Sequence, residues 1–157
     1  MQVDHYSHYF SAFQLEDRLI FSCCVKTIEG QWYLHQPIVV LDVQSSHFHI
    51  GQTVLETLAR SEQGWLEPPD AVTLAGTSAR LFESARVQTF EQLLERVLHG
   101  CVGRAADIIE MTPTHIGSGH AVDFLVDARL RLKANMPAAQ TGEALQNLFA
   151  ACTSIYR

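Results

Sequence analysis

The chain has 157 residues, of which 47% are hydrophobic and 18% charged, a composition that predicts one globular domain spanning residues 1–157. Only 9 Gly and 5 Pro are present, which excludes a collagen-like or low-complexity chain. Eleven Lys and Arg against seventeen Asp and Glu give a net charge of -6, which does not suit the neutralisation of phosphates. No apolar run approaches the roughly 18 residues of a membrane helix. We therefore expect no nucleic-acid partner and no membrane partner.

The first regular pattern runs over residues 18–26, where apolar residues alternate with others and form one fully apolar face, as in a strand. Glu29 and Gly30 supply a turn, and residues 32–43 form a second aromatic and β-branched strand. The two strands predict an antiparallel hairpin. Pro37 has no N–H for the ladder, so it is expected at a strand end, a bulge or an outer edge.

The first helix is predicted to begin after Ser45 or Ser46 and to end at Arg60, because apolar residues recur on one face. Residues 61–78 contain Gly and Pro with little periodicity, which predicts a long connection. Residues 89–99 then show helical spacing.

Residues 107–112, 121–126 and 130–134 read as three further strands, and residues 139–154 as a closing helix. Together the elements predict an α+β fold: an antiparallel sheet of about five strands with three helices packed on it, in the order β-β-α-α-β-β-β-α.

Residues 1–8 carry acid and histidine in place of the basic segment that opens a signal peptide, so we expect a cytoplasmic protein with a frayed N-terminus. The four cysteines show no CxxC spacing, so reduced and mostly buried thiols are predicted. They are Cys23, Cys24, Cys101 and Cys152.

Eight histidines are the unusual feature of the composition. His47 and His49 would point the same way on a strand and could share a metal with His115 or His120, but would diverge at a helix start. No recognised ligand motif is present, so surface or capping roles and no metal site are expected.

No catalytic constellation is expected either. Asp107, Glu110, Asp123 and Asp127 fit a solvated sheet face, and residues 117–119 lack the Lys of a phosphate-binding loop. The sequence predicts a protein without catalytic residues, metal or cofactor. The alternative is a small histidine-dependent hydrolase or metal-dependent enzyme. Its histidines would come from His35, His47, His49, His115 and His120.

Three segments resemble the immunity proteins of bacterial contact-dependent growth inhibition systems, the CdiI type. Residues 50–61 read IGQTVLETLARS and are similar to a helix of that family. Residues 108–115, IIEMTPTH, followed by 117–122, resemble its strand, P-T-H turn and glycine-containing loop. Residues 141–152, TGEALQNLFAAC, are similar to its closing helix.

The resemblance implies a cytoplasmic protein that binds and neutralises a cognate CdiA C-terminal toxin domain, frequently a nuclease, without chemistry of its own. The acidic charge would favour encounter with a basic toxin. Some members of the family accept a toxin hairpin alongside their own sheet.

We expect the toxin to be contacted by acidic, aromatic and histidine side chains of the sheet and loops, in a chain that is a monomer or a weak homodimer paired through edge strands. The candidate contact residues are Glu29, Trp32, Tyr33, Glu110, His115, His120, Asp123 and Asp127.

Overall fold

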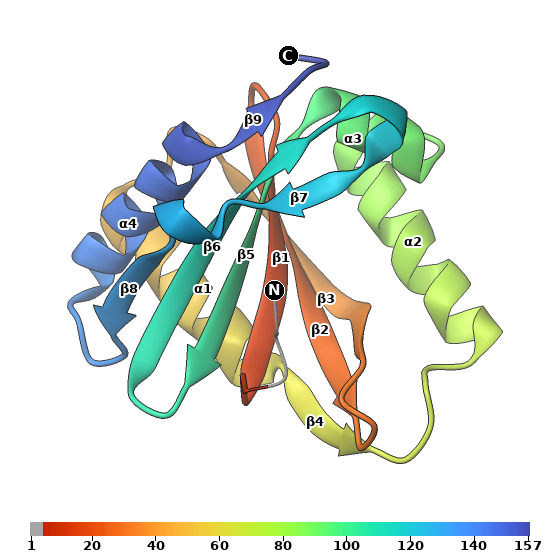
Figure 1. Ribbon diagram of the computed structural model, residues 1–157, viewed down its shortest axis with the longest axis horizontal. Coiled ribbons are helices and arrows are strands. Elements are labelled where there is room, and N and C mark those ends of the chain that lie inside the picture. Colours follow the sequence, from red (N-terminus) through yellow and green to blue (C-terminus); the bar gives the residue numbers. More distant parts are fainter. Residues whose placement is uncertain (1–4) are drawn as a thin grey trace.

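A mixed β-sheet runs through the molecule, and helices pack on both of its faces (Figure 1). The computed structural model describes residues 5–157. Within this range the strands are β1 (His8–Gln14), β2 (Arg18–Thr27), β3 (Trp32–Asp42), β4 (Glu62–Trp65), β5 (Leu98–Ala105), β6 (Ile108–Ile116), β7 (Val122–Phe124), β8 (Leu130–Lys133) and β9 (Thr153–Ser154). The helices are α1 (His47–Arg60), α2 (Ala71–Ala85), α3 (Phe90–Arg96) and α4 (Ala138–Ala151), with short 3-10 helices η1 (Ser118–His120) and η2 (Val126–Ala128). The predicted α+β class is confirmed.

The sheet is mostly antiparallel. Its strands follow the order β3-β2-β1-β5-β6-β7, with β8 also antiparallel to β6. Only β4 beside β2 and β9 beside β6 run parallel. The predicted N-terminal hairpin is confirmed, since Arg18 pairs with Asp42 and Lys26 with Trp32. The β2–β3 register shifts between Ser22 and Cys24, and Pro37 lies opposite this shift, at an irregularity of the outer strand as expected.

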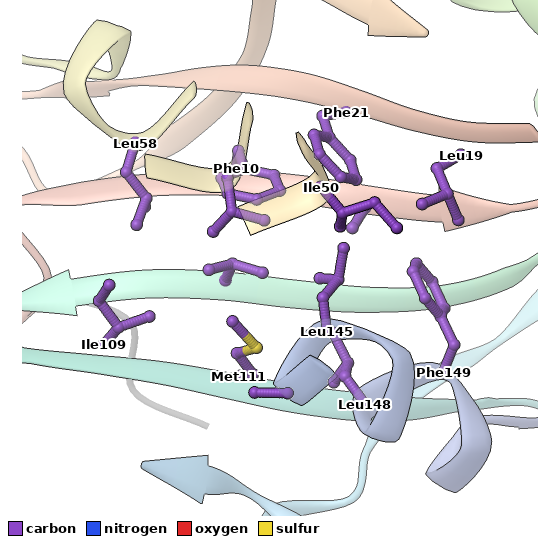
Figure 2. Close-up of a cluster of buried hydrophobic side chains, with 14 of the residues drawn as sticks. Phe10, Leu19, Phe21, Ile50, Leu58, Ile109, Met111, Leu145, Leu148 and Phe149 are labelled. Carbon is purple, nitrogen blue, oxygen red and sulfur yellow. The ribbon is translucent and has the colours of Figure 1, made fainter. Parts of the chain in front are cut away.

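Helices α1 and α4 cover one face of the sheet, which we call the helical face. Figure 2 shows side chains of β1, β2, β5 and β6 meeting those of α1 and α4 in one buried cluster. Each such side chain stabilises the fold by about 1.5–3 kcal/mol on burial. The labelled members are Phe10, Leu19, Phe21, Ile50, Leu58, Ile109, Met111, Leu145, Leu148 and Phe149.

Two glycines let α1 and α4 approach each other closely. A Cβ on Gly51 would overlap the carbonyl oxygen of Ala138, and a Cβ on Gly142 would overlap that of His47. Both obstacles are backbone atoms, which cannot rotate away as a side chain can. Glycine at these positions therefore sets the distance between the two helices.

The start of α1 is where the sequence predicted it. The Ser46 side chain accepts a hydrogen bond from the His49 backbone N–H at 3.1 Å, satisfying one of the free donors of the first turn. The helix ends before Ser61, whose hydroxyl donates to the Cys24 carbonyl and accepts from the Tyr9 N–H. Ser61 therefore ties the end of α1 to β1 and β2.

The opposite face, which we call the open face, is covered by helices over only part of its area. Leu81 of α2 and Leu93 of α3 pack on Phe13, Ile20 and Ile116 of the sheet. A separate buried cluster of Tyr6, Tyr9, Cys24 and Cys101 lies beyond these helices on the same sheet. The open face thus leaves aromatic side chains outside the cover of α2 and α3.

Three elements correct the sequence prediction. Residues 8–14 form β1, a strand that was not predicted and that begins at His8, where a frayed end was expected; both of its faces are buried, so it shows no alternation. Helix α2 lies where a connection was expected up to residue 78, because Asp70 caps it by accepting from the Thr73 N–H at 2.7 Å. Residues 98–105 form β5, although the second helix was expected to reach His99.

The element count changes accordingly. Within residues 5–157 there are nine strands and four α-helices, against about five strands and three helices expected. The closing helix also stops at Ala151, and Thr153–Ser154 pairs with β6 as β9. All four cysteines are buried and free, as predicted. None of the helices in the described part of the chain is both long and apolar enough to cross a bilayer.

Candidate binding groove

A groove of about 360 Å³ opens on the open face of the sheet. Its floor comes from β1, β2 and β5, and its walls from β3, α3 and β7, the strand that crosses in front of the sheet (Figure 1). Concave, mainly apolar surfaces with a few polar groups bind small ligands or a partner's anchor side chains. The lining residues are Tyr9, Ser11, Phe13, Cys24, Trp32, Leu34, Phe90, Leu94, His99, Val122 and Phe124.

A row of aromatic rings leads from this groove along the open face. The rings of Tyr9 and Trp32 lie 5.3 Å apart between centroids, and those of Tyr6 and Tyr9 lie 5.9 Å apart and stack. The Lys26 ammonium lies 5.5 Å from the centre of the Trp32 ring. Aromatic rings at these separations stabilise each other by more than the burial of their surface alone, so the rings of the row support one another.

The row ends at a buried carboxylate. The Tyr6 hydroxyl donates to Glu110 Oε2 at 2.5 Å, Arg129 Nη1 donates to the same oxygen at 3.1 Å, and Arg131 Nε donates to Oε1 at 2.8 Å. The Tyr6 ring lies over Gly103, where a Cβ would come within 2.6 Å of the ring. Burial raises the pKa of the Glu110 carboxyl, but the hydrogen bond from Tyr6 and the two guanidinium charges outweigh it and hold that pKa below its ordinary value.

Replacing Glu110 with Gln should lower the free energy of unfolding at pH 7 by about 2 kcal/mol, because Arg129 loses its buried counter-charge. The folded-state pKa is lowered, so this stabilisation is present above the unfolded pKa of 4.5 and is lost as the pH falls. Urea denaturation at pH 7 and pH 3.5 measures both values. Asp123→Asn, at an exposed position of β7, is the control and should change stability by less than about 0.5 kcal/mol. An equal cost of Glu110→Gln at both pH values would contradict the assignment.

His99 lies in the floor of the groove, and only 9% of it is exposed. Its ring packs against that of Phe13, with 5.0 Å between centroids. Nδ1 lies 3.2 Å from Thr114 Oγ1, and Nε2 lies 3.8 Å from the Cys101 sulfur. Burial lowers the pKa of His99 from 6.5 to about 4, so the ring is neutral at pH 7.

This lowered pKa makes the stability depend on pH. The unfolded chain binds a proton at pH 6.5 and the folded chain only near pH 4, so stability is complete above 6.5 and is lost as the pH falls between these values. Between pH 7.5 and pH 5 the wild-type chain should lose about 2 kcal/mol more than the His99→Leu variant. Paired denaturation curves at the two pH values give this difference, and parallel losses in both proteins would rule it out.

The histidines of the β6–β7 region hold the chain in place beside the groove. His120 Nε2 lies 3.0 Å from Glu95 Oε1 of α3, and the His120 ring stacks on Tyr156 at 5.1 Å. His115 Nδ1 lies 2.8 Å from Thr153 Oγ1 of β9. The first contact joins η1 to α3, and the second joins β6 to β9. Neither His115 nor His120 lines the groove.

Only two of the eight candidate contact residues belong to the groove or to the aromatic row. Trp32 lines the groove, and Glu110 lies at the end of the aromatic row. The others are dispersed: Glu29 is exposed in the β2–β3 turn, Tyr33 donates to Gln31 Oε1, and Asp123 and Asp127 are exposed on β7 and η2. Neighbouring strand residues point to opposite faces, so Tyr33 lies on the other side of β3 from Trp32.

The sequence prediction missed most of the groove. Tyr9 and His99 lie on strands that were not predicted, and Phe90 and Phe124 lie in a predicted helix and a predicted strand but were not proposed as contact residues. The aromatic run of residues 9–13 was the available signal, because three aromatic rings in five residues are more typical of a buried strand than of a frayed end.

The histidines predicted as possible metal ligands do not converge. His47 and His49 lie in the first turn of α1, where residues two apart diverge, and His47 Nε2 lies 2.6 Å from Gln146 Oε1. In the part of the chain that the structure describes, no three His, Cys, Asp or Glu side chains gather closely enough to bind a metal ion.

A second hollow, of about 430 Å³, lies near the β1–β2 turn and is lined by four arginines. Three of them already donate to backbone carbonyls: Arg18 to Ser84, Arg96 to Arg86, and Arg157 to Gln14 and Arg96. These guanidinium groups satisfy the carbonyls of Ser84, Arg86 and Arg96 at the ends of α2 and α3, and that of Gln14 at the end of β1. The groove on the open face is therefore the better candidate site.

Comparison with known proteins shows that solved structures share this fold. The chain matches no protein-family model and no curated protein sequence. It is similar to a solved protein of unknown function from Neisseria meningitidis, with a TM-score of 0.78, 16% identity, and 92% of this chain and 94% of that chain covered.

It is also similar to a chain of a CdiA-CT/CdiI toxin and immunity complex from Yersinia pseudotuberculosis. The TM-score is 0.75 at 12% identity, over 92% of this chain and 97% of that chain. The predicted resemblance to the CdiI type is thus matched by a shared fold.

Proposed function

We propose that this chain is an immunity protein that binds a cognate CdiA C-terminal toxin domain in the cytoplasm and blocks it by occupying its surface. The observation that carries the proposal is the aromatic groove on the open face. It lies on a fold shared with a component of a toxin and immunity complex, and the opposite face is closed by α1 and α4. Partly exposed anchors such as Trp32 and Phe90 are typical of binding hot spots.

The toxin is proposed to be a basic protein, such as a nuclease. Exposed acidic residues stand on two walls of the groove, Glu91 and Glu95 on α3 and Asp123 on β7, and Asp127 follows in η2, three residues after the end of β7. A negative field on this side accelerates the approach of a positive partner. The outer edge of β3, at the end of the sheet order, also offers backbone groups to which a toxin strand could add.

The direct test uses the toxin domain encoded immediately upstream of this chain. Co-purification and calorimetric titration should give a complex of one copy each, and the chain should abolish toxin activity in a purified assay and in cells. A toxin domain that neither binds nor loses activity would end the proposal.

Charge reversal on the open face should slow association. Asp123→Lys together with Asp127→Lys is expected to lower the association rate constant about tenfold at low salt and less at high salt, because surface charges act over a screened distance. Stopped-flow fluorescence measures the rates. Glu56→Lys with Glu143→Lys on the helical face changes the net charge equally and should leave the rate nearly unchanged. Equal slowing by both pairs would show that only the total charge matters.

A further inference from the structure

The hydrogen bonds around His99 determine which of its ring nitrogens carries the proton. The Thr114 hydroxyl donates its single proton to the His99 carbonyl at 2.7 Å. The Thr114 oxygen has no second proton to donate, so it can only accept a hydrogen bond from Nδ1, which lies 3.2 Å away. Nδ1 therefore carries the ring proton. The ring is neutral because burial lowers the pKa of His99 to about 4. Nε2 is therefore left as an acceptor.

This acceptor has a weak partner. Nε2 contacts the Cys101 thiol at 3.8 Å, and an S–H group is a poor hydrogen-bond donor. The surrounding groove offers mainly aromatic and aliphatic surface. Its volume of about 360 Å³ is at the lower end of the roughly 300–1,000 Å³ of ligand sites, which suits one or two side chains.

We propose that the groove holds an aromatic side chain carrying a single N–H or O–H donor, as tryptophan and tyrosine do, and that His99 Nε2 accepts this donor. The aromatic walls bind the ring, and the imidazole selects rings with a donor over purely apolar ones. The inference rests on the proposed function, since it names the chemistry of the toxin's anchor in the same groove. A donor that replaces the thiol relieves a poorly satisfied buried acceptor, which is where hydrogen bonds discriminate most.

The experiment uses free ring compounds and the intact chain. In 1-methylindole a methyl group replaces the donor hydrogen of indole, and phenol and toluene form a second pair, of nearly equal size, with and without the donor. In NMR titrations indole should bind about five- to tenfold more tightly than 1-methylindole, and phenol should bind more tightly than toluene. Correlation spectra of the histidine ring nitrogens should show a protonated Nδ1 and an unprotonated Nε2, and indole should shift the Nε2 resonance.

The His99→Leu variant should bind indole and 1-methylindole equally. If that variant does not fold, the two ligand pairs and the ring-nitrogen spectra of the wild-type chain decide. Equal binding within each pair, no binding of any ring, or a proton on Nε2 would overturn the inference.

The ring compounds and the toxin test different statements. Selective binding of indole with no binding of the toxin domain would refute the immunity function and leave the groove chemistry standing. Toxin binding without selectivity for the donor would do the reverse.

Discussion

Replacing Gly142 with Ala is expected to lower the free energy of unfolding by about 2–3 kcal/mol. The added Cβ would overlap the His47 carbonyl oxygen, so α1 and α4 must separate and the core beneath them loses contact. The better helix propensity of Ala offsets about 1 kcal/mol of this strain. Gly51→Ala meets the Ala138 carbonyl in the same way and should behave alike.

Gly76 supplies the matched control. It lies in α2, and a Cβ there would meet nothing within 4 Å. Gly76→Ala should therefore stabilise the chain by about 0.5–1 kcal/mol through the lower backbone entropy of the unfolded state. Chemical denaturation of the three variants gives all values. Stability in Gly142→Ala equal to that of the wild type would mean that the two helices are not in close contact.

Replacing Trp32 with Ala should weaken toxin binding by about thirtyfold or more, equivalent to about 2 kcal/mol, because a large anchor at the rim of the groove is removed. Phe124→Ala, on the facing wall, should weaken binding in the same direction. Both residues are only partly buried, so both variants should fold. Isothermal titration with the toxin domain measures the affinities.

Phe48→Ala is the matched control for these variants. Phe48 is an aromatic residue that is 55% exposed in the first turn of α1, away from the groove. Its replacement should leave the affinity unchanged within about a factor of two. A loss at Phe48 equal to that at Trp32 would move the binding surface to the helical face.

The sequence predicted those parts of the fold that depend on local pattern. The alternation of residues 18–26 predicted β2 and its apolar face, and Ser46 predicted the start of α1, because both depend on neighbours in the chain. Strand β1 pairs Tyr9 with Gly103, far away in sequence, and nothing in residues 8–14 records this partner. Gly100 and Gly103 weaken the strand pattern of residues 98–105, although their missing side chains make room for Leu148 and Tyr6.

The groove could be predicted even less well, for the same reason. Its floor and walls come from strands and a helix that are brought together only by the long-range order of the sheet. Trp32 was among the predicted contact residues because it is an aromatic residue of a predicted strand. The role of His99 depends on a hydrogen bond from Thr114, a residue on another strand, so composition and spacing could not reveal it.

The division of the sheet into a helical face and an open face separates the residues that stabilise the fold from those that line the groove. Residues between α1 and α4 form the buried cluster that holds the fold together, whereas the proposed function assigns contact with the toxin to wall residues such as Leu34 and Phe124. Under the proposed function, a substitution in the wall would alter partner choice without bringing the protein close to its stability threshold. The fold itself is compatible with wide sequence change, since it is shared with a chain that is 12% identical to this one.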